Sequence, residues 1–127
     1  MKIALVCSEV IRESGHGRYM LELARRLATR HEVHVFTHLY QPVPGATHRP
    51  VPAPLGINLI RLFAFWARST WAIGREPFDV VHTIGGCCAR RDVVTAQFCQ
   101  RPWGAELAKT EAVGSPLRRL YHQAYWR

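Results

Sequence analysis

The chain has 127 residues, 48% of them hydrophobic, which is enough for one folded domain and argues against intrinsic disorder. Seventeen Lys and Arg residues against nine Asp and Glu residues give a formal net charge of +8. This charge attracts phosphates, nucleic acid or anionic lipid headgroups, but it does not choose among them. The longest apolar cluster, residues 62–67, is far too short for a membrane-spanning helix, which needs roughly 20 residues.

The amino terminus carries one basic residue, Lys2, followed by an apolar stretch that ends at Cys7. This stretch is too short for the apolar region of a secretory signal peptide. We therefore expect a cytoplasmic protein. Peripheral association with the inner face of the plasma membrane stays open at this point, because the net charge is positive.

The first part of the chain alternates between strand and helix patterns. Residues 2–7 form a short apolar run typical of a buried parallel strand, and residues 32–37 form a second. Between them, Met20, Leu23 and Leu27 lie on one face of a predicted helix, with charged residues on the other. Strand, helix and strand in under 40 residues predict a βαβ unit with a right-handed crossover.

The remaining elements extend the same pattern. Residues 38–56 hold five of the eight prolines and are predicted to form a surface loop that has room for one short extended segment. A helix is predicted over 57–74, strands over 78–84 and 92–98, and a last helix from Ser115 that reaches the final residue without a stop signal. The order predicts an α/β fold: a Rossmann-like, doubly wound, mostly parallel sheet with helices on both faces.

Cysteine and histidine spacing gives no sign of a metal site. Four cysteines, Cys7, Cys87, Cys88 and Cys99, form no CxxC pair, so we expect reduced and mostly buried thiols. His34 and His38 are four residues apart, but they lie along and just beyond a predicted strand, and this spacing brings two ligands together only on a helix. We interpret them as structural or solvated.

Two glycines, Gly15 and Gly17, come directly before the first predicted helix. Free amides at a helix start bind anions, and glycine lets an anion approach closely. A dinucleotide site is disfavoured, because Met20 stands where a third glycine belongs and the second strand ends in Thr37 and His38 rather than in an acid. No Gly-Lys-Ser/Thr follows the loop either. The alternative is that the glycines only shape the strand-to-helix connection.

Three segments in register resemble a known family. "MKIALVCSEV", "ESGHGRYMLELARRLATRHEVHVFT" and "PFDVVHTIGG" are similar to the N-terminal half of the family 4 glycosyltransferases. These are retaining enzymes in which two Rossmann-like domains face each other across a cleft, the GT-B architecture. The resemblance implies that residues 1–127 form a single N-terminal, acceptor-side domain of an apparently truncated chain, with the C-terminal donor-binding domain absent.

The resemblance assigns the glycine turn to the donor. Gly15 and Gly17 match the turn whose amides lie near the diphosphate of a nucleotide sugar, and Arg18 adds a cation there. No metal and no further cofactor are expected, because the nucleotide sugar is itself the substrate.

The other matched positions belong to the acceptor cleft. His82 ends the third strand, with Gly85 and Gly86 beyond it, although His82 is equally compatible with packing at a strand end. In the family the fourth strand usually ends in a histidine, where this sequence has Gln97. Gln donates hydrogen bonds but does not titrate, so proton transfer at Gln97 is disfavoured, and the side chain also suits satisfying backbone groups.

The function implied is sugar transfer from a nucleotide diphosphate donor to a hydroxyl acceptor, either a glycan or a lipid-linked molecule. The family holds the donor with two glutamates seven residues apart in the C-terminal domain, and Glu106 and Glu111 have the wrong spacing. Residues 1–127 alone are therefore not expected to transfer sugar. The alternative is a nucleotide- or anion-binding module, or a subunit, without catalysis of its own.

The basic charge would also suit two further partners, an anionic membrane surface and nucleic acid. The helix over 57–74 combines aromatic and basic residues that suit an anionic membrane surface, although such a helix more often packs on a sheet. These residues are Phe63, Phe65, Trp66, Trp71, Arg61, Arg68 and Arg75. Nucleic-acid binding is disfavoured, because the arginines are dispersed and no RNP-like or helix-turn-helix pattern is present.

Overall fold

The computed structural model describes residues 1–54 and 58–96. Its elements are β1 (Lys2–Val6), β2 (Glu9–Val10), α1 (Gly15–Leu27), β3 (Glu32–Thr37), β4 (Leu39–Tyr40), β5 (Ala46–Pro50), α2 (Asn58–Gly74), β6 (Val80–Ile84) and β7 (Val93–Thr95). All of them lie in one compact unit, Met1–Thr95, and a second unit comprises Ala96–Arg127. Gln97, Cys99 and the helix predicted from Ser115 lie outside the described residues.

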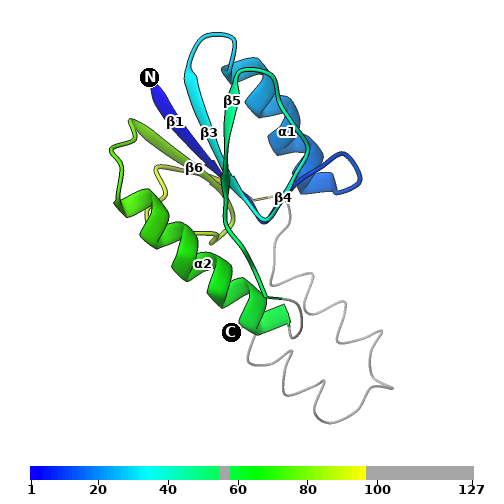
Figure 1. Ribbon diagram of the computed structural model, residues 1–127, viewed down its shortest axis with the longest axis vertical. Coiled ribbons are helices and arrows are strands. Elements are labelled where there is room, and N and C mark those ends of the chain that lie inside the picture. The colour runs from blue at the N-terminus through cyan, green and yellow to red at the C-terminus, as the bar shows by residue number, and fades with distance from the viewer. Residues whose placement is uncertain (55–57, 97–127) are drawn as a thin grey trace. The chain divides into compact units, whose positions relative to one another are not determined.

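The main sheet has five strands in the order β5-β3-β1-β6-β7, and every neighbouring pair is parallel (Figure 1). Ile3 in the central strand pairs with Val33 of β3 on one side and with Val80 of β6 on the other. The chain builds outward from β1 to β3 and β5, and then crosses back to β6 and β7. The predicted α/β, doubly wound, parallel fold is therefore confirmed.

The two helices cover opposite faces of this sheet because side chains alternate along each strand. Ile3 and Leu5 of β1 pack in one cluster with Met20, Leu21 and Ala24 of α1. Ala4 and Val6 pack in the other cluster, to which α2 contributes Phe65 and Ile73. Both faces of β1 are thus buried, which explains its continuous apolar sequence.

The region predicted as a loop over 38–56 contains two strands, so that prediction was incomplete. β5 pairs with β3 along its whole length, from Val33 opposite Ala46 to Thr37 opposite Pro50. β4 pairs with β2 in a separate two-stranded sheet. Pro50 is tolerated because β5 is an edge strand, where a residue without an N–H breaks no ladder on the open side.

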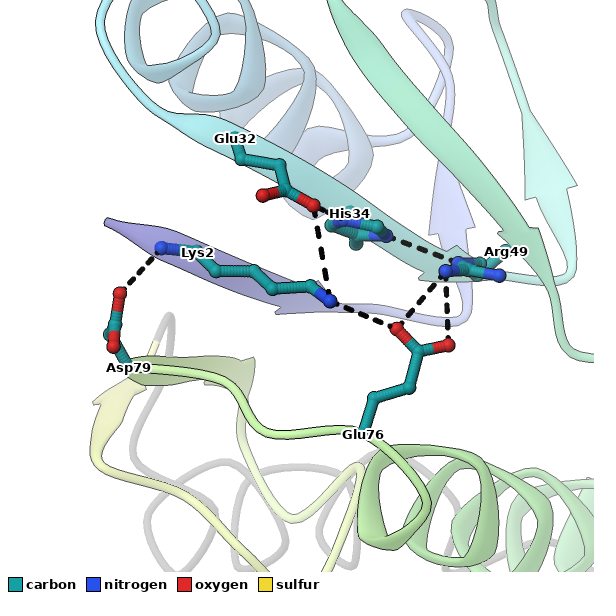
Figure 2. Close-up of polar contacts among 6 residues, drawn as sticks. All are labelled: Lys2, Glu32, His34, Arg49, Glu76 and Asp79. Atoms are coloured by element: carbon teal, nitrogen blue, oxygen red, sulfur yellow. Dashed lines mark hydrogen bonds and ion pairs between the residues drawn. The ribbon is translucent and has the colours of Figure 1, made fainter.

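A polar cluster ties β3, β5 and the segment after α2 together near the amino ends of the strands (Figure 2). Arg49 donates from Nε to Nδ1 of His34 over 3.1 Å, and Nε2 of His34 lies 2.7 Å from Oε1 of Glu32. Since Nδ1 accepts from Arg49, the imidazole proton is assigned to Nε2, which donates to Glu32. His34 is buried, so of the two predicted alternatives, structural or solvated, its contacts support the structural one.

Glu76 completes the cluster after α2. Its carboxylate accepts from Nζ of Lys2 at 3.2 Å and from Arg49 at 3.0 Å. The hydrogen bond from Lys2, followed by the charge of Arg49, lowers the pKa of Glu76. The backbone N–H of Lys2 also donates to Asp79, immediately before β6. These contacts hold the starts of β1, β3 and β6 in register, at the end of the sheet opposite the predicted site.

Candidate functional site at the carboxyl edge of the sheet

The predicted site residues that the structure describes lie beside the carboxyl ends of β1 and β6, where the strand order reverses. In open α/β sheets, ligands bind in the crevice outside this switch point. The loop after β1 leads through Ser14 into α1, and β6 leads directly into Gly85. Backbone hydrogen bonds from His38 and Leu39 to the carbonyl of Ser8 anchor the loop after β1 to the end of β3.

The glycines lie inside the first turn of α1, not before it, which corrects the sequence-based placement. α1 begins at Gly15, Ser14 is its N-cap residue in extended conformation, and the amide of Arg18 closes the first turn on the carbonyl of Ser14 at 2.7 Å. The Ser14 hydroxyl makes no capping hydrogen bond and instead contacts the ring of His16. The first turn also lacks an acidic residue. An anion is thus the complementary partner for this helix start.

The two glycines have different physical roles. A Cβ on Gly17 would lie 2.8 Å from the carbonyl oxygen of Ile11 and 2.9 Å from that of Glu9, so Gly17 is required for close packing of α1 against the β2 segment. A Cβ on Gly15 would meet nothing within 4 Å, and Gly15 is exposed. Gly15 therefore leaves open space at the helix start.

Two charged groups flank this helix start. Arg18 is exposed in the first turn of α1. Glu9 of β2 places Oε2 3.9 Å from Nε2 of His16, so a protonated His16 would be paired with a carboxylate. The helix dipole and Arg18 make the site attractive to anions, and Glu9 moderates that attraction.

His82 lies on β6 with its side chain on the same side of the sheet as α1. Its Nε2 is 2.8 Å from Oγ1 of Thr95, and its ring meets that of Tyr19 edge to face with centroids 6.4 Å apart. Burial lowers the pKa of His82, so the neutral imidazole is favoured near neutral pH. Sequence reasoning missed Tyr19 and Thr95. Tyr19 offered one signal, an aromatic residue on the otherwise charged face of the first helix.

Gly85 and Gly86 form the turn after β6. Gly85 has a φ of +57°, a left-handed conformation that favours glycine, and its amide donates to the carbonyl of Thr95 at 3.1 Å. Its own carbonyl accepts from the Thr83 hydroxyl at 2.8 Å. Gly86 is exposed beside Arg91. The turn thus joins β6 to the end of β7.

The described cysteines are unsuited to nucleophilic chemistry. Cys7, Cys87 and Cys88 are free thiols. Burial raises the pKa of Cys7 to about 12 and the pKa values of Cys87 and Cys88 to about 11, so the reactive thiolate is scarce at neutral pH.

Two further features concern metals and membranes. Over residues 1–54 and 58–96, no group of three or more His, Cys, Asp or Glu side chains is arranged to hold a metal ion. His38 accepts a hydrogen bond at Nδ1 from the amide of Ala53. Within that same part of the chain, neither helix combines the length and apolar character needed to cross a bilayer.

Comparison with known proteins identifies the family. The model of Glycosyltransferase Family 4 matches residues 14–127. No curated protein matches the chain. The chain is similar in fold to a solved structure of WaaG, a glycosyltransferase involved in lipopolysaccharide biosynthesis, with a TM-score of 0.73 and 23% identity. The match covers 98% of this chain and 34% of the WaaG chain, so this chain spans about a third of that length. Since the family model accounts for nearly all of its residues, the chain belongs to glycosyltransferase family 4.

Proposed function

We propose that this chain is the acceptor-side domain of a retaining glycosyltransferase that moves a sugar from a nucleotide diphosphate to a hydroxyl group of a glycan or lipid-linked acceptor. Family membership supports glycosyl transfer in general. One observation supports the location of the site. The start of α1 at Gly15, where an added Cβ would meet nothing, lies one turn from Tyr19, which contacts His82. A helix start suited to an anion and the buried imidazole of His82 therefore lie at the same end of the sheet.

The donor diphosphate is assigned to the start of α1. Amides of the first turn would donate to phosphate oxygens, and Arg18 would add a charge-assisted contact. Gly15 provides access for the phosphate, whereas Gly17 keeps α1 seated on the β2 segment. As the glycosidic bond to phosphate breaks, negative charge grows on the leaving diphosphate, and fixed dipoles stabilise it. Neither a metal nor a further cofactor takes part in this assignment.

The acceptor is assigned to the turn after β6. Gly85 and Gly86 leave this turn without side chains, which lets a sugar hydroxyl approach the backbone. His82 supports the acceptor side through a hydrogen bond rather than through charge, because its neutral form is favoured. Gln97, predicted from the sequence for the same cleft, lies outside the described residues. A separate donor-binding domain is the remaining partner that the proposal requires.

The test uses the protein as its gene encodes it, incubated with radiolabelled nucleotide sugars and glycan or lipid-linked acceptors. We expect Gly15→Val to lower transfer by about 100-fold, because it obstructs the phosphate-facing amides. Gly74→Val is the matched control, since Gly74 also lies at a helix end with nothing within 4 Å of an added Cβ. Equal activities of the two variants would refute the helix-start assignment, and diphosphate binding without turnover would favour a binding module.

We also propose that α2 contacts an anionic membrane surface. Ile60, Phe63 and Trp71 are 57 to 68% exposed on this helix, and no acidic residue occurs over 58–74. Arg61 and Arg68 are exposed and seven residues apart, so they lie on one side of the helix, and Arg75 follows its last residue. The Arg68 guanidinium also donates to the carbonyl of Pro52. Phe65 does not belong to this surface, because it is buried in the core. An apolar stripe beside a basic row is typical of helices that lie in the membrane interface.

Vesicle sedimentation tests the membrane proposal. Binding to vesicles that contain phosphatidylglycerol is expected at low salt, with weaker binding at high salt and to purely phosphatidylcholine vesicles. The double substitution Phe63→Ser and Trp71→Ser should weaken binding, whereas Leu39→Ser, which removes an exposed apolar side chain from β4, should not. Equal sedimentation of the two proteins would argue against α2 as the contact.

A further inference from the structure

Three side chains from three separate elements form a continuous polar chain beside the helix start. The hydroxyl of Tyr19 in α1 is 3.4 Å from Oγ1 of Thr95 at the end of β7. The same Oγ1 is 2.8 Å from Nε2 of His82 in β6. Tyr19 is 42% exposed, whereas His82 is 9% exposed, so this chain of hydrogen bonds runs from the surface to a buried imidazole.

The direction of the hydrogen bonds follows from the chemistry of the two ends. Tyr19 carries the most acidic hydroxyl of the three groups, and a neutral imidazole nitrogen is the strongest acceptor among them. The Thr95 hydroxyl has one hydrogen to donate and lone pairs to accept with. The favoured order is therefore Tyr19 donating to Thr95 and Thr95 donating to Nε2 of His82. In that order the imidazole carries its proton on Nδ1.

We propose that Tyr19 and Thr95 are positioning residues that hold His82 with its Nε2 lone pair occupied and its proton on Nδ1. This inference rests on the proposed function, to which it adds the role of His82. With Nε2 engaged, His82 is a poor base for an acceptor hydroxyl. Its Nδ1 bonds to no side chain or backbone group of residues 1–54 and 58–96, and Nδ1–H can donate to a substrate oxygen. The role of His82 is thus hydrogen-bond donation to substrate rather than proton removal.

The hydrogen-bonded chain of Tyr19, Thr95 and His82 also connects the two parts of the proposed site, the start of α1 and the turn after β6. Tyr19 follows Gly15 by one turn of α1, so a ligand at the helix start lies next to the first member of the chain. Thr95 accepts the Gly85 amide through its backbone carbonyl, so its position depends on the turn after β6. One residue therefore links the helix start, the acceptor-side turn and the imidazole.

The tautomer of His82 is measured directly by nitrogen-15 NMR of the imidazole rings in the 127-residue chain. The wild type is expected to show the Nδ1–H form. Thr95→Val removes the donor to Nε2 and should shift His82 toward the Nε2–H form, while Thr95→Ser should restore the wild-type signal. Thr47→Val on the exposed edge strand β5 is the matched control and should leave His82 unchanged.

Tyr19→Phe gives a second test that does not depend on how Thr95→Val folds, because Tyr19 is exposed. It removes the outermost hydroxyl and should raise the fraction of the Nε2–H form to a smaller extent. An Nε2–H form in the wild type would overturn the inference. So would a tautomer that neither Tyr19→Phe nor Thr95→Val changes.

The tautomer is read without any sugar transfer, so its outcome is separate from that of the proposed function. Where transfer is observed, Thr95→Val should lower kcat by about 10-fold with little change in KM, equivalent to the loss of one hydrogen bond. Thr95→Ser should retain most of kcat. If the protein as its gene encodes it transfers no sugar while His82 shows the Nδ1–H form, the positioning role would stand and the transferase assignment would be refuted.

Discussion

Arg49 and His34 form a hydrogen bond between neighbouring strands that do not place these residues opposite each other. Nε of Arg49 donates to Nδ1 of His34 over 3.1 Å, although the backbone register sets His34 against Thr47 and Arg49 against Phe36. The Arg49 side chain therefore reaches back along β5 toward the start of the sheet. Arg49 thereby links the edge strand β5 to the buried His34 and to Glu76 (Figure 2).

Replacement of Arg49 is expected to destabilise the fold. Arg49→Met retains much of the side-chain length but leaves Nδ1 of the buried His34 without its donor, which costs about 1 to 3 kcal/mol. Urea unfolding monitored by circular dichroism measures the loss. Arg26→Met, on the exposed face of α1, is the control and should stay within about 0.5 kcal/mol of the wild type. Equal unfolding midpoints for the two variants would contradict the structural role of Arg49.

The loss of folding stability at acidic pH should depend on Glu32 and Glu76. The hydrogen bond with His34 is the main cause of the lowered pKa of Glu32. The hydrogen bond with Lys2 is the main cause of the lowered pKa of Glu76. Both carboxyls have an unperturbed pKa of 4.5. A lowered folded-state pKa stabilises the protein above the unfolded pKa, and this stability is lost as the pH falls through the folded value.

The free energy of unfolding is therefore expected to fall as the pH drops below 4.5. The Glu32→Gln and Glu76→Gln double variant should be less stable than the wild type near pH 7, with a shallower decline in acid. Urea titrations at a series of pH values provide the comparison. Parallel curves for the two proteins would show that these carboxylates do not govern the loss of folding stability at acidic pH.

The two glycines of α1 should respond oppositely to alanine. Gly17→Ala places a methyl group 2.8 Å from the Ile11 carbonyl oxygen, and the resulting shift of α1 should cost about 1 to 3 kcal/mol. Gly15→Ala meets open space and restricts the unfolded chain, so stability should stay level or rise by up to about 1 kcal/mol. Thermal unfolding of both variants checks the contrast, and similar losses at both positions would contradict the packing role of Gly17.

The described thiols should react slowly in the folded protein. In a Cys99→Ser background, Cys7, Cys87 and Cys88 are expected to resist a maleimide reagent at pH 7, since burial raises the pKa of each to about 11 or 12. Mass spectrometry of the time course should show rapid labelling only after addition of urea. Fast labelling of the native protein would mean that these thiols are accessible and ionise readily.

Local patterning was sufficient to predict most of the parallel sheet. The apolar runs of β1 and β3 and the stripe that includes Met20 indicate burial directly, because both faces of a parallel strand and one face of its helix pack in a core. The edge strand β5 was allowed for only as an unplaced extended segment of the loop. A strand that is half exposed and ends in Pro50 lacks that apolar signal, and its pairing with β3 depends on contacts distant in sequence.

The candidate site was likewise predictable from the sequence only in part. The sequence by itself determined that Gly15 and Gly17 adjoin a helix start and that His82 ends a strand. Only the tertiary structure decided that Gly17 serves packing, since the carbonyl oxygens of Ile11 and Glu9 approach it from another segment. Tyr19 and Thr95 are 76 residues apart in the chain, and they meet because the strand order brings the end of β7 to the start of α1. Such a contact is a property of strand order, which no local pattern encodes.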